Sequence, residues 1–152
     1  MAKLAELHNL FPALCEFVKM GKPVWETCAG QKEGGQELIG GLDCTVHPLR
    51  LKFSYQILLL GLVAKEGGLP SFRAVFIPAP VILEVGPGVE VLASVTIKST
   101  KIVDPSQEGE LDSQVIVAVK QGNLLATAFH IELTIDSRWH SYFMKMSGVI
   151  MK

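Results

Sequence analysis

Two side chains with complementary chemistry, Asp43 and His47, lie four positions apart in the sequence. A carboxylate beside an imidazole raises the imidazole pKa and fixes its tautomer, which makes a general base that can activate water. The alternative is a turn aspartate and a surface histidine ahead of Pro48, which the turn chemistry of aspartate favours. Cys44, between them, fits a small buried hydrophobe better than a nucleophile. Asp43 and His47 are the candidate catalytic residues.

Three polar side chains, Ser54, Tyr55 and Gln56, follow in the next element. A hydroxyl or amide placed there could donate a hydrogen bond to a substrate carbonyl or hold a water molecule. In the alternative, Tyr55 packs in the core and the other two side chains face solvent. We take the three as candidate substrate-binding residues.

Outside these two groups the sequence offers little chemistry. His130 shares the polar face of a predicted strand with Glu132 and Thr134, so we expect a solvated side chain. No cluster of His, Cys, Asp and Glu has metal-ligand spacing, and no GxSxG motif is present. The sequence therefore predicts neither a metal site nor a cofactor.

Helical spacing marks the first twenty residues. Pro12 is expected to divide this segment and to lie in the first turn of its second helix. Gly21 is a plausible stop, and Pro23 reinforces it. The apolar positions that carry the pattern are Leu4, Leu7, Leu10, Leu14, Phe17 and Val18.

Alternating apolar and polar residues predict three consecutive antiparallel strands in the second half of the chain. Their apolar faces begin at Val89, Val115 and Leu125, and the last strand is expected to reach Ile135. The sequence Gln121-Gly122-Asn123 has the chemistry of a hairpin turn. Shorter strands are expected at 24–28 and 37–46. A strand at 72–85 must bend, bulge or run along an edge at Pro78-Ala79-Pro80, because proline cannot donate to a central ladder.

The segment 48–66 decides the architecture. Its first half alternates as a strand does, whereas its second half contains strong helix formers and ends at Gly67-Gly68. Strands rarely exceed ten residues, so the length of the segment favours a helix. A strand remains the alternative.

The composition is rich in apolar residues (49%) and poor in charged ones (19%), with a mean hydropathy of +0.35. The chain of 152 residues is expected to form a single domain, 1–152. A net charge of −1 gives no attraction for nucleic acid. The most apolar stretch, 53–64, is shorter than the roughly 20 residues of a transmembrane helix. The surplus apolar surface therefore predicts a homo-oligomer or an enclosed apolar ligand.

The N-terminus and the cysteines indicate where the protein works. The N-terminus lacks the apolar core of a signal peptide, and the three cysteines, Cys15, Cys28 and Cys44, form no CxxC motif. We expect a cytoplasmic protein. At the other end of the chain, the aromatic and Met-rich tail from Trp139 onwards is expected to fold back on the sheet, with an exposed docking patch as the alternative.

The order of a helix followed by long antiparallel strands resembles the hotdog fold. The stretch in which such proteins leave one strand, turn at a glycine and begin the next resembles Phe76-Ile-Pro-Ala-Pro-Val followed by Gly86-Pro-Gly-Val-Glu-Val-Leu-Ala-Ser-Val. Their final hairpin resembles Val115-Ile-Val-Ala-Val-Lys-Gln-Gly-Asn-Leu-Leu-Ala-Thr-Ala. The resemblance implies an α+β protein in which a curved antiparallel sheet wraps a central apolar helix, with an N-terminal helical segment in addition.

The same resemblance implies a function. Hotdog proteins bind acyl-CoA or acyl-carrier-protein thioesters at the interface of a homodimer, as thioesterases or hydratases. Asp43 and His47 are similar to the Asp and His of the hydratase branch, but their spacing is one residue shorter and the flanking Asn-Pro is absent. Whether the chain is an enzyme is left open. The alternative is a non-catalytic β-rich module that binds an apolar ligand or serves as an assembly subunit.

Overall fold

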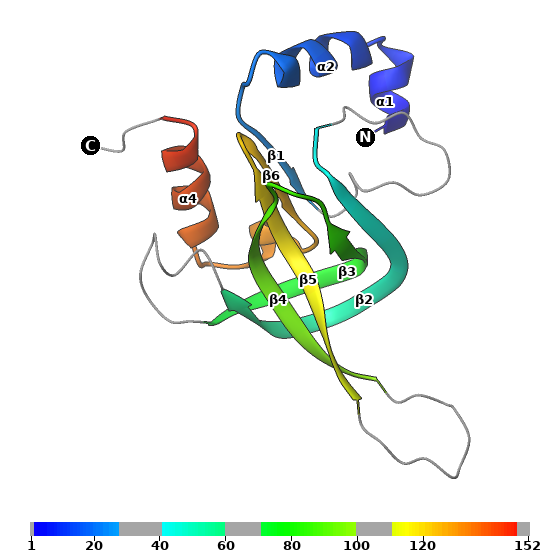
Figure 1. The fold of residues 1–152 in the computed structure, drawn as a ribbon, viewed down its shortest axis with the longest axis vertical. Helices are drawn as coiled ribbons and strands as arrows, with labels where there is room; N and C mark the ends of the chain where they lie inside the picture. Colours follow the sequence, from blue (N-terminus) through cyan, green and yellow to red (C-terminus); the bar gives the residue numbers. More distant parts are fainter. Residues whose placement is uncertain (1, 28–40, 60–70, 100–110, 149–152) are drawn as a thin grey trace.

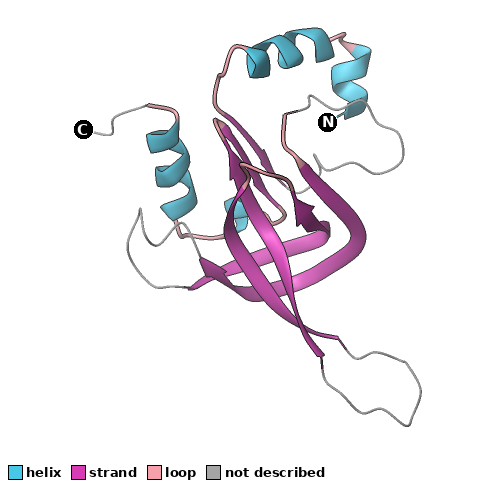
Figure 2. Ribbon diagram, in the orientation of Figure 1, coloured by secondary structure: helices cyan, strands magenta, loops and turns pink. Residues whose placement is uncertain are grey.

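The computed structural model describes residues 2–27, 41–59, 71–99 and 111–148, of which 2–4, 47–59, 78–80, 98–99 and 111–113 are described as backbone alone. A curved sheet forms the body of the molecule, and the helices lie at its outside (Figure 1, Figure 2). The elements in chain order are α1 (Ala2–Leu7), α2 (Phe11–Lys19), β1 (Val24–Thr27), β2 (Cys44–Leu59), β3 (Ser71–Val85), β4 (Glu90–Ser99), β5 (Leu111–Gln121), β6 (Leu124–Thr127), the 3-10 helix η1 (Ile131–Leu133) and α4 (Arg138–Met146).

The N-terminal helices confirm the predicted division. Pro12 lies in the first turn of α2, where its missing N–H leaves no hydrogen bond unmade. Asn9, between the two helices, takes a positive φ of 51°. Gly21 ends the helical segment at a φ of 69°, a left-handed conformation that glycine adopts at no steric cost.

Four of the six strands in the described ranges pair in a closed ring. β2 pairs with β3 and β4, and β5 pairs with β3 and β4, all antiparallel. The β2–β3 register shifts on both sides of the pair Leu51↔Ala79. Ala79 stands between Pro78 and Pro80, neither of which has an N–H to donate. The predicted interruption of this strand is therefore confirmed as a register irregularity within β3.

The hairpin β5–β6 carries the chain to the other edge of the sheet. Gln121 pairs with Leu124, so the loop is the two-residue Gly122-Asn123, and Gly122 adopts a φ of 56°. This turn and the three antiparallel strands β4, β5 and β6 were predicted. The expected continuation of the last strand to Ile135 is wrong. β6 ends at Thr127, and η1 follows it instead.

A parallel pair completes the sheet. β1 lies beside β6 with Val24 opposite Leu124 and Thr27 opposite Thr127. Because the strands are parallel and in register, both end at the same edge. Thr27 and Thr127, the last residues of the two strands, therefore lie side by side.

The core lies between the sheet and α4. Trp139 and Tyr142 of α4 are buried against Phe72 and Phe129, so the tail folds back on the sheet as expected. A second, smaller cluster on the other side of β5 and β6 is built on Ile82, Val119 and Ala126. The buried apolar residues of the described ranges belong to these two clusters, whereas several large apolar side chains remain exposed, among them Leu7, Leu10, Phe17, Met20 and Ile135.

The expected hotdog architecture is wrong. The segment that would be its central helix is the strand β2, and no helix in the described ranges is enclosed by the sheet (Figure 2). Pairing of β2 with β3 from Cys44↔Val85 to Leu58↔Ser71 outweighs the helix propensity of its second half. No helix in the described part of the chain is long and apolar enough to cross a membrane.

Candidate functional site

The candidate site lies at the edge of the sheet where β1 and β6 both end. Thr127, the last residue of β6, lies opposite Thr27, the last residue of β1. His130 follows Thr127 by three positions. Cys28, which follows Thr27 in the sequence, lies outside the described residues.

The His130 imidazole is hydrogen-bonded to the carboxylate of Glu132. Its Nδ1 lies 2.7 Å from Oε1 of Glu132, and the pKa of Glu132 falls below its ordinary value mainly because the carboxylate accepts this hydrogen bond. The His130 side chain is 20% exposed. Its Nε2 is buried and has no hydrogen-bond partner among the described residues. With Nδ1–H donating to the carboxylate, Nε2 carries the free lone pair and is the nitrogen that can accept a proton.

The backbone around His130 is held by the sheet. The N–H of His130 donates to the carbonyl of Val75 in β3 at 2.9 Å, and the N–H of Ala128 donates to the carbonyl of Val117 in β5 at 2.8 Å. After β6 the chain thus bonds first to β5, through Ala128, and then to β3, through His130. The imidazole is therefore carried by a turn whose backbone is fixed at two points.

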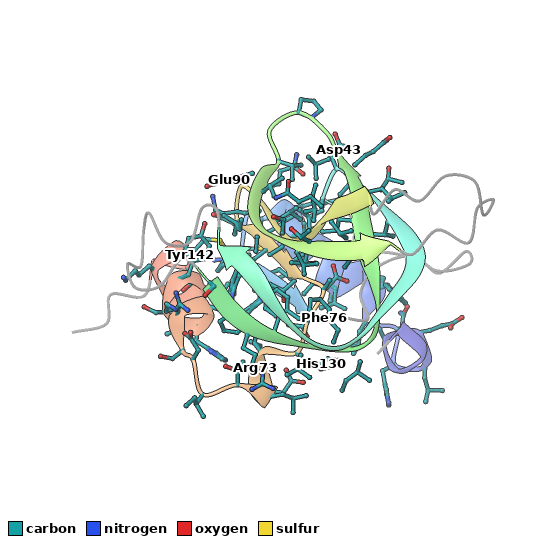
Figure 3. The ribbon with its side chains drawn as sticks, turned by 90° about the horizontal axis from the view of Figure 1, so that it is seen from below. Asp43, Arg73, Phe76, Glu90, His130 and Tyr142 are labelled. Atoms are coloured by element: carbon teal, nitrogen blue, oxygen red, sulfur yellow. The ribbon has the colours of Figure 1, made fainter. Side chains whose placement is uncertain are left out.

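The residue before His130 is its main packing anchor. The ring of Phe129 is fully buried, with centroids 5.6 Å from Phe72, 5.8 Å from Phe76 and 5.3 Å from Trp139. Figure 3 shows His130 on the same side of the molecule as Phe76. Burial of Phe129 restricts the directions in which the next side chain can point.

An ion pair between Arg138 and Asp136 secures the chain beyond η1. The Arg138 guanidinium donates from Nε to both carboxylate oxygens of Asp136 at 3.0 Å and from Nη2 to the Ser71 carbonyl at 2.9 Å. Arg138 thereby holds the pKa of Asp136 below its ordinary value. The contact joins the start of α4 to the start of β3.

The predicted acid–base residues lie elsewhere. Asp43 is exposed before β2 on the side of the molecule opposite His130 (Figure 3), and its N–H donates to Oε1 of Gln121 at 2.8 Å. His47 is a backbone position of β2 paired with Val81, and nothing of its side chain is described. The Asp43–His47 pair therefore stays a prediction. Burial, followed by the charges of Glu26 and Asp43, raises the pKa of the Cys44 thiol, which disfavours the thiolate that a nucleophile needs.

The predicted substrate-binding residues lie on a strand. Ser54, Tyr55 and Gln56 occupy consecutive positions of β2, and their backbones pair with Val75, Ala74 and Arg73 of β3. Their side chains are not described, so their role stays a prediction.

Sequence reasoning missed the importance of His130 and Glu132. It continued β6 through them and so placed both on a solvated polar face. Because β6 ends at Thr127, His130 directly precedes η1 and Glu132 lies within η1, and the imidazole is mostly buried. The signal available was a histidine and a glutamate two positions apart, just after a run of small residues, Ala126-Thr127-Ala128. No group of metal ligands occurs in the described parts of the chain.

Comparison with known proteins gives one consistent result. The model of the SNO glutamine amidotransferase family matches residues 1–148. The "probable pyridoxal 5'-phosphate synthase subunit PDX2" of Arabidopsis thaliana is 57% identical over 172 residues, covering 99% of this chain and 68% of the relative. The "pyridoxal 5'-phosphate synthase subunit PdxT" of Listeria monocytogenes serotype 4a is 36% identical over 151 residues, covering 95% and 71%.

The match to the plant relative also reveals a difference in length. It extends over 172 residues, 20 more than the 152 of this chain. The relative therefore contains at least 20 residues inside the matched stretch that have no counterpart in this chain.

Solved structures agree with the family assignment. A crystal structure of a glutamine amidotransferase matches with a TM-score of 0.67 and 31% identity, covering 97% of this chain and 73% of that one. A glutamine amidotransferase from Thermotoga maritima matches with a TM-score of 0.54 and 14% identity, covering 99% and 62%, which shows the fold alone. These neighbours have a Rossmann-like α/β fold. Their fold contradicts the hotdog assignment independently of the strand observed at β2.

The comparisons also correct the predicted function. The matched family and relatives are glutamine amidotransferases and synthase subunits, not proteins of acyl thioester metabolism. The expected thioesterase or hydratase activity, the acyl-CoA ligand and the homodimeric thioester site are therefore wrong. The alternative of a non-catalytic module for an apolar ligand has no support either. Since the family model covers nearly the whole chain, the chain belongs to the SNO glutamine amidotransferase family.

Proposed function

We propose that this protein hydrolyses the side-chain amide of glutamine and is the ammonia-producing subunit of a pyridoxal 5'-phosphate synthase. The observation that supports this most is the hydrogen-bonded pair of His130 and Glu132. The Nε2 atom of His130 is buried and has no partner among the described residues. Membership of an amidotransferase family supplies the class of substrate. The names of the plant and Listeria relatives supply the role as a synthase subunit.

The first half of the reaction forms a thioester. In our proposal Nε2 of His130 takes the proton of the Cys28 thiol, and the thiolate attacks the amide carbon of glutamine. The imidazolium formed is stabilised by the carboxylate of Glu132. It then gives its proton to the amide nitrogen, the C–N bond breaks, and ammonia leaves. A glutamyl thioester on Cys28 remains.

The second half releases glutamate. Nε2 of His130 takes a proton from water, the resulting hydroxide attacks the thioester carbonyl, and the C–S bond breaks. The thiolate regains the proton from the imidazolium. Glutamine and water have then become glutamate and ammonia, and both side chains have returned to their starting protonation.

Two further parts of the proposal concern context. The ammonia would be consumed by another subunit of the synthase, which is therefore the expected protein partner. We also propose that the protein works in the cytoplasm, because a nucleophilic Cys28 must remain a free thiol and thiols stay reduced there. Cell fractionation followed by immunodetection tests the location.

The function is tested by measuring the release of ammonia and glutamate from glutamine, with and without the partner synthase subunit. Cys28→Ser should abolish turnover. The matched control is Cys15→Ser, which removes a free thiol from α2, and it should keep the wild-type rate. Equal rates for the wild type and Cys28→Ser would contradict the proposal.

A further inference from the structure

We infer that Trp25 and Thr127 are positioning residues that hold the base and the nucleophile of this reaction at their working separation. The inference rests on the proposed function. Trp25 precedes Cys28 by three positions, and Thr127 precedes His130 by three. Each of the two side chains therefore lies three positions before one of the two reactive residues in the sequence.

The link between the strands is a side-chain hydrogen bond. Nε1–H of Trp25 in β1 donates to Oγ1 of Thr127 in β6 at 3.1 Å. Thr127 is 1% exposed, so its hydroxyl depends on a protein partner. The bond lies at the end of the pair, where Thr127 is the last residue to face β1.

β1 needs such a link because little else fixes it. The strand has four residues, and among the described elements β6 is its one strand partner. Parallel pairing is less stable per residue than antiparallel pairing. A small shift of β1 along β6 would move the residues after Thr27 relative to His130, and about 1 Å of misplacement can cost roughly a hundredfold in rate.

The helix α4 reinforces both sides of this link. The Trp25 ring lies 5.5 Å from the His140 ring and 5.4 Å from the Phe143 ring, centroid to centroid. Trp139, one turn before Phe143 in the helix, lies 5.3 Å from Phe129, the residue before His130. One helix therefore packs against the segments that lead to both reactive positions.

Three substitutions separate positioning from packing. Trp25→Phe keeps an aromatic ring and removes the donor, Thr127→Val keeps the shape and removes the acceptor, and Thr127→Ser keeps the hydroxyl. We expect the first two to lower kcat for glutamine hydrolysis about tenfold, with KM changed less than twofold, and Thr127→Ser to retain most of kcat. The double variant Trp25→Phe/Thr127→Val should be no slower than either single variant, because both remove the same bond.

A matched control removes a similar bond away from the site. The Ser94 hydroxyl is 2% exposed and accepts a hydrogen bond from Nε2 of Gln114 at 2.8 Å. Ser94→Ala should keep kcat within twofold at a temperature where all variants are folded. If Trp25→Phe and Thr127→Val keep kcat as Ser94→Ala does, or if the double variant shows additive losses, the inference is wrong.

A measurement without turnover distinguishes this inference from the proposed function. The pH dependence of alkylation of Cys28 by iodoacetamide reports how its thiol is coupled to His130. We expect His130→Ala to shift the profile to higher pH and the two positioning variants to shift it partway. An unchanged profile in His130→Ala would overturn the pairing itself and the inference with it. A shift in His130→Ala with none in Trp25→Phe and Thr127→Val would overturn the positioning role alone.

Discussion

Nδ1 of His130 and Oε1 of Glu132 lie 2.7 Å apart at the start of η1, in the turn-like segment that follows β6, and this contact leaves Nε2 as the imidazole nitrogen without a partner among the described residues. The two residues are separated by a single position, so the turn itself brings them together. The sheet and the aromatic core set where the turn lies, because His130 N–H bonds to Val75 and Phe129 is buried.

Glu132→Gln should slow glutamine hydrolysis roughly a hundredfold. The amide can still contact Nδ1, but it has no charge to stabilise the imidazolium and no longer selects the tautomer in which Nε2 accepts a proton. Steady-state ammonia release at saturating glutamine measures the effect. A kcat within threefold of the wild type would show that the carboxylate is not needed.

The Asp136–Arg138 contact predicts a pH-dependent contribution to stability. The pKa of Asp136 is lowered in the folded state, so its contribution is complete above the ordinary value of 3.8 and is lost as pH falls through the lowered value. Asp136→Asn should cost about 1 kcal/mol at pH 7, or roughly 2–4 °C in Tm, and nothing once the wild-type carboxyl is protonated. Thermal unfolding between pH 2 and 7 measures the difference, and a constant difference across that range would contradict an origin in the charge of Asp136.

Removal of the Glu26 carboxylate is expected to stabilise the protein, the opposite of the effect expected at Asp136. Burial raises the pKa of Glu26, so its charged form is disfavoured in the folded protein and costs stability at neutral pH. Glu26→Gln should therefore raise Tm by roughly 2–4 °C at pH 7, and the gain should shrink as pH falls towards the ordinary value of 4.5. A lower Tm for the variant at pH 7 would show that the carboxylate makes a stabilising contact instead.

Phe129→Ala should be strongly destabilising. Removing a large, fully buried ring costs about 3–5 kcal/mol, a large fraction of the stability of a typical domain. The matched control is Ile135→Ala, at a fully exposed position, which should change stability by less than about 0.5 kcal/mol. Urea denaturation measures both, and similar midpoints for the two variants would contradict the assigned core.

Local signals in the sequence predicted the local structure well. Pro12 and Gly21 bound α2, and Gly122 in a two-residue loop joins β5 to β6, because the backbone conformations of these residues are restricted or unusually free. The strand at 44–59 was harder to predict. Its second half prefers a helix by propensity, and it is a strand because β3 and β4 pair with it, which no local pattern records.

The candidate site was hidden for the same reason. Glu132 and Thr134 follow His130 at the two-residue period of a strand, so alternation alone placed all three on a solvent-exposed face. The end of β6 at Thr127 and the hydrogen bond to Val75 bury the imidazole, and the partner strand β3 lies more than 50 positions away in the sequence. The spacing of the three cysteines argued against a disulfide scaffold or a zinc finger, and it did not single out Cys28.

Replacement of His130 tests the central claim most directly. We predict that His130→Ala, assayed with its synthase partner at saturating glutamine, loses at least roughly a hundredfold in the rate of ammonia release while its Tm stays near that of the wild type. Ammonia release at the wild-type rate by the folded variant would contradict the assignment of His130 as the base.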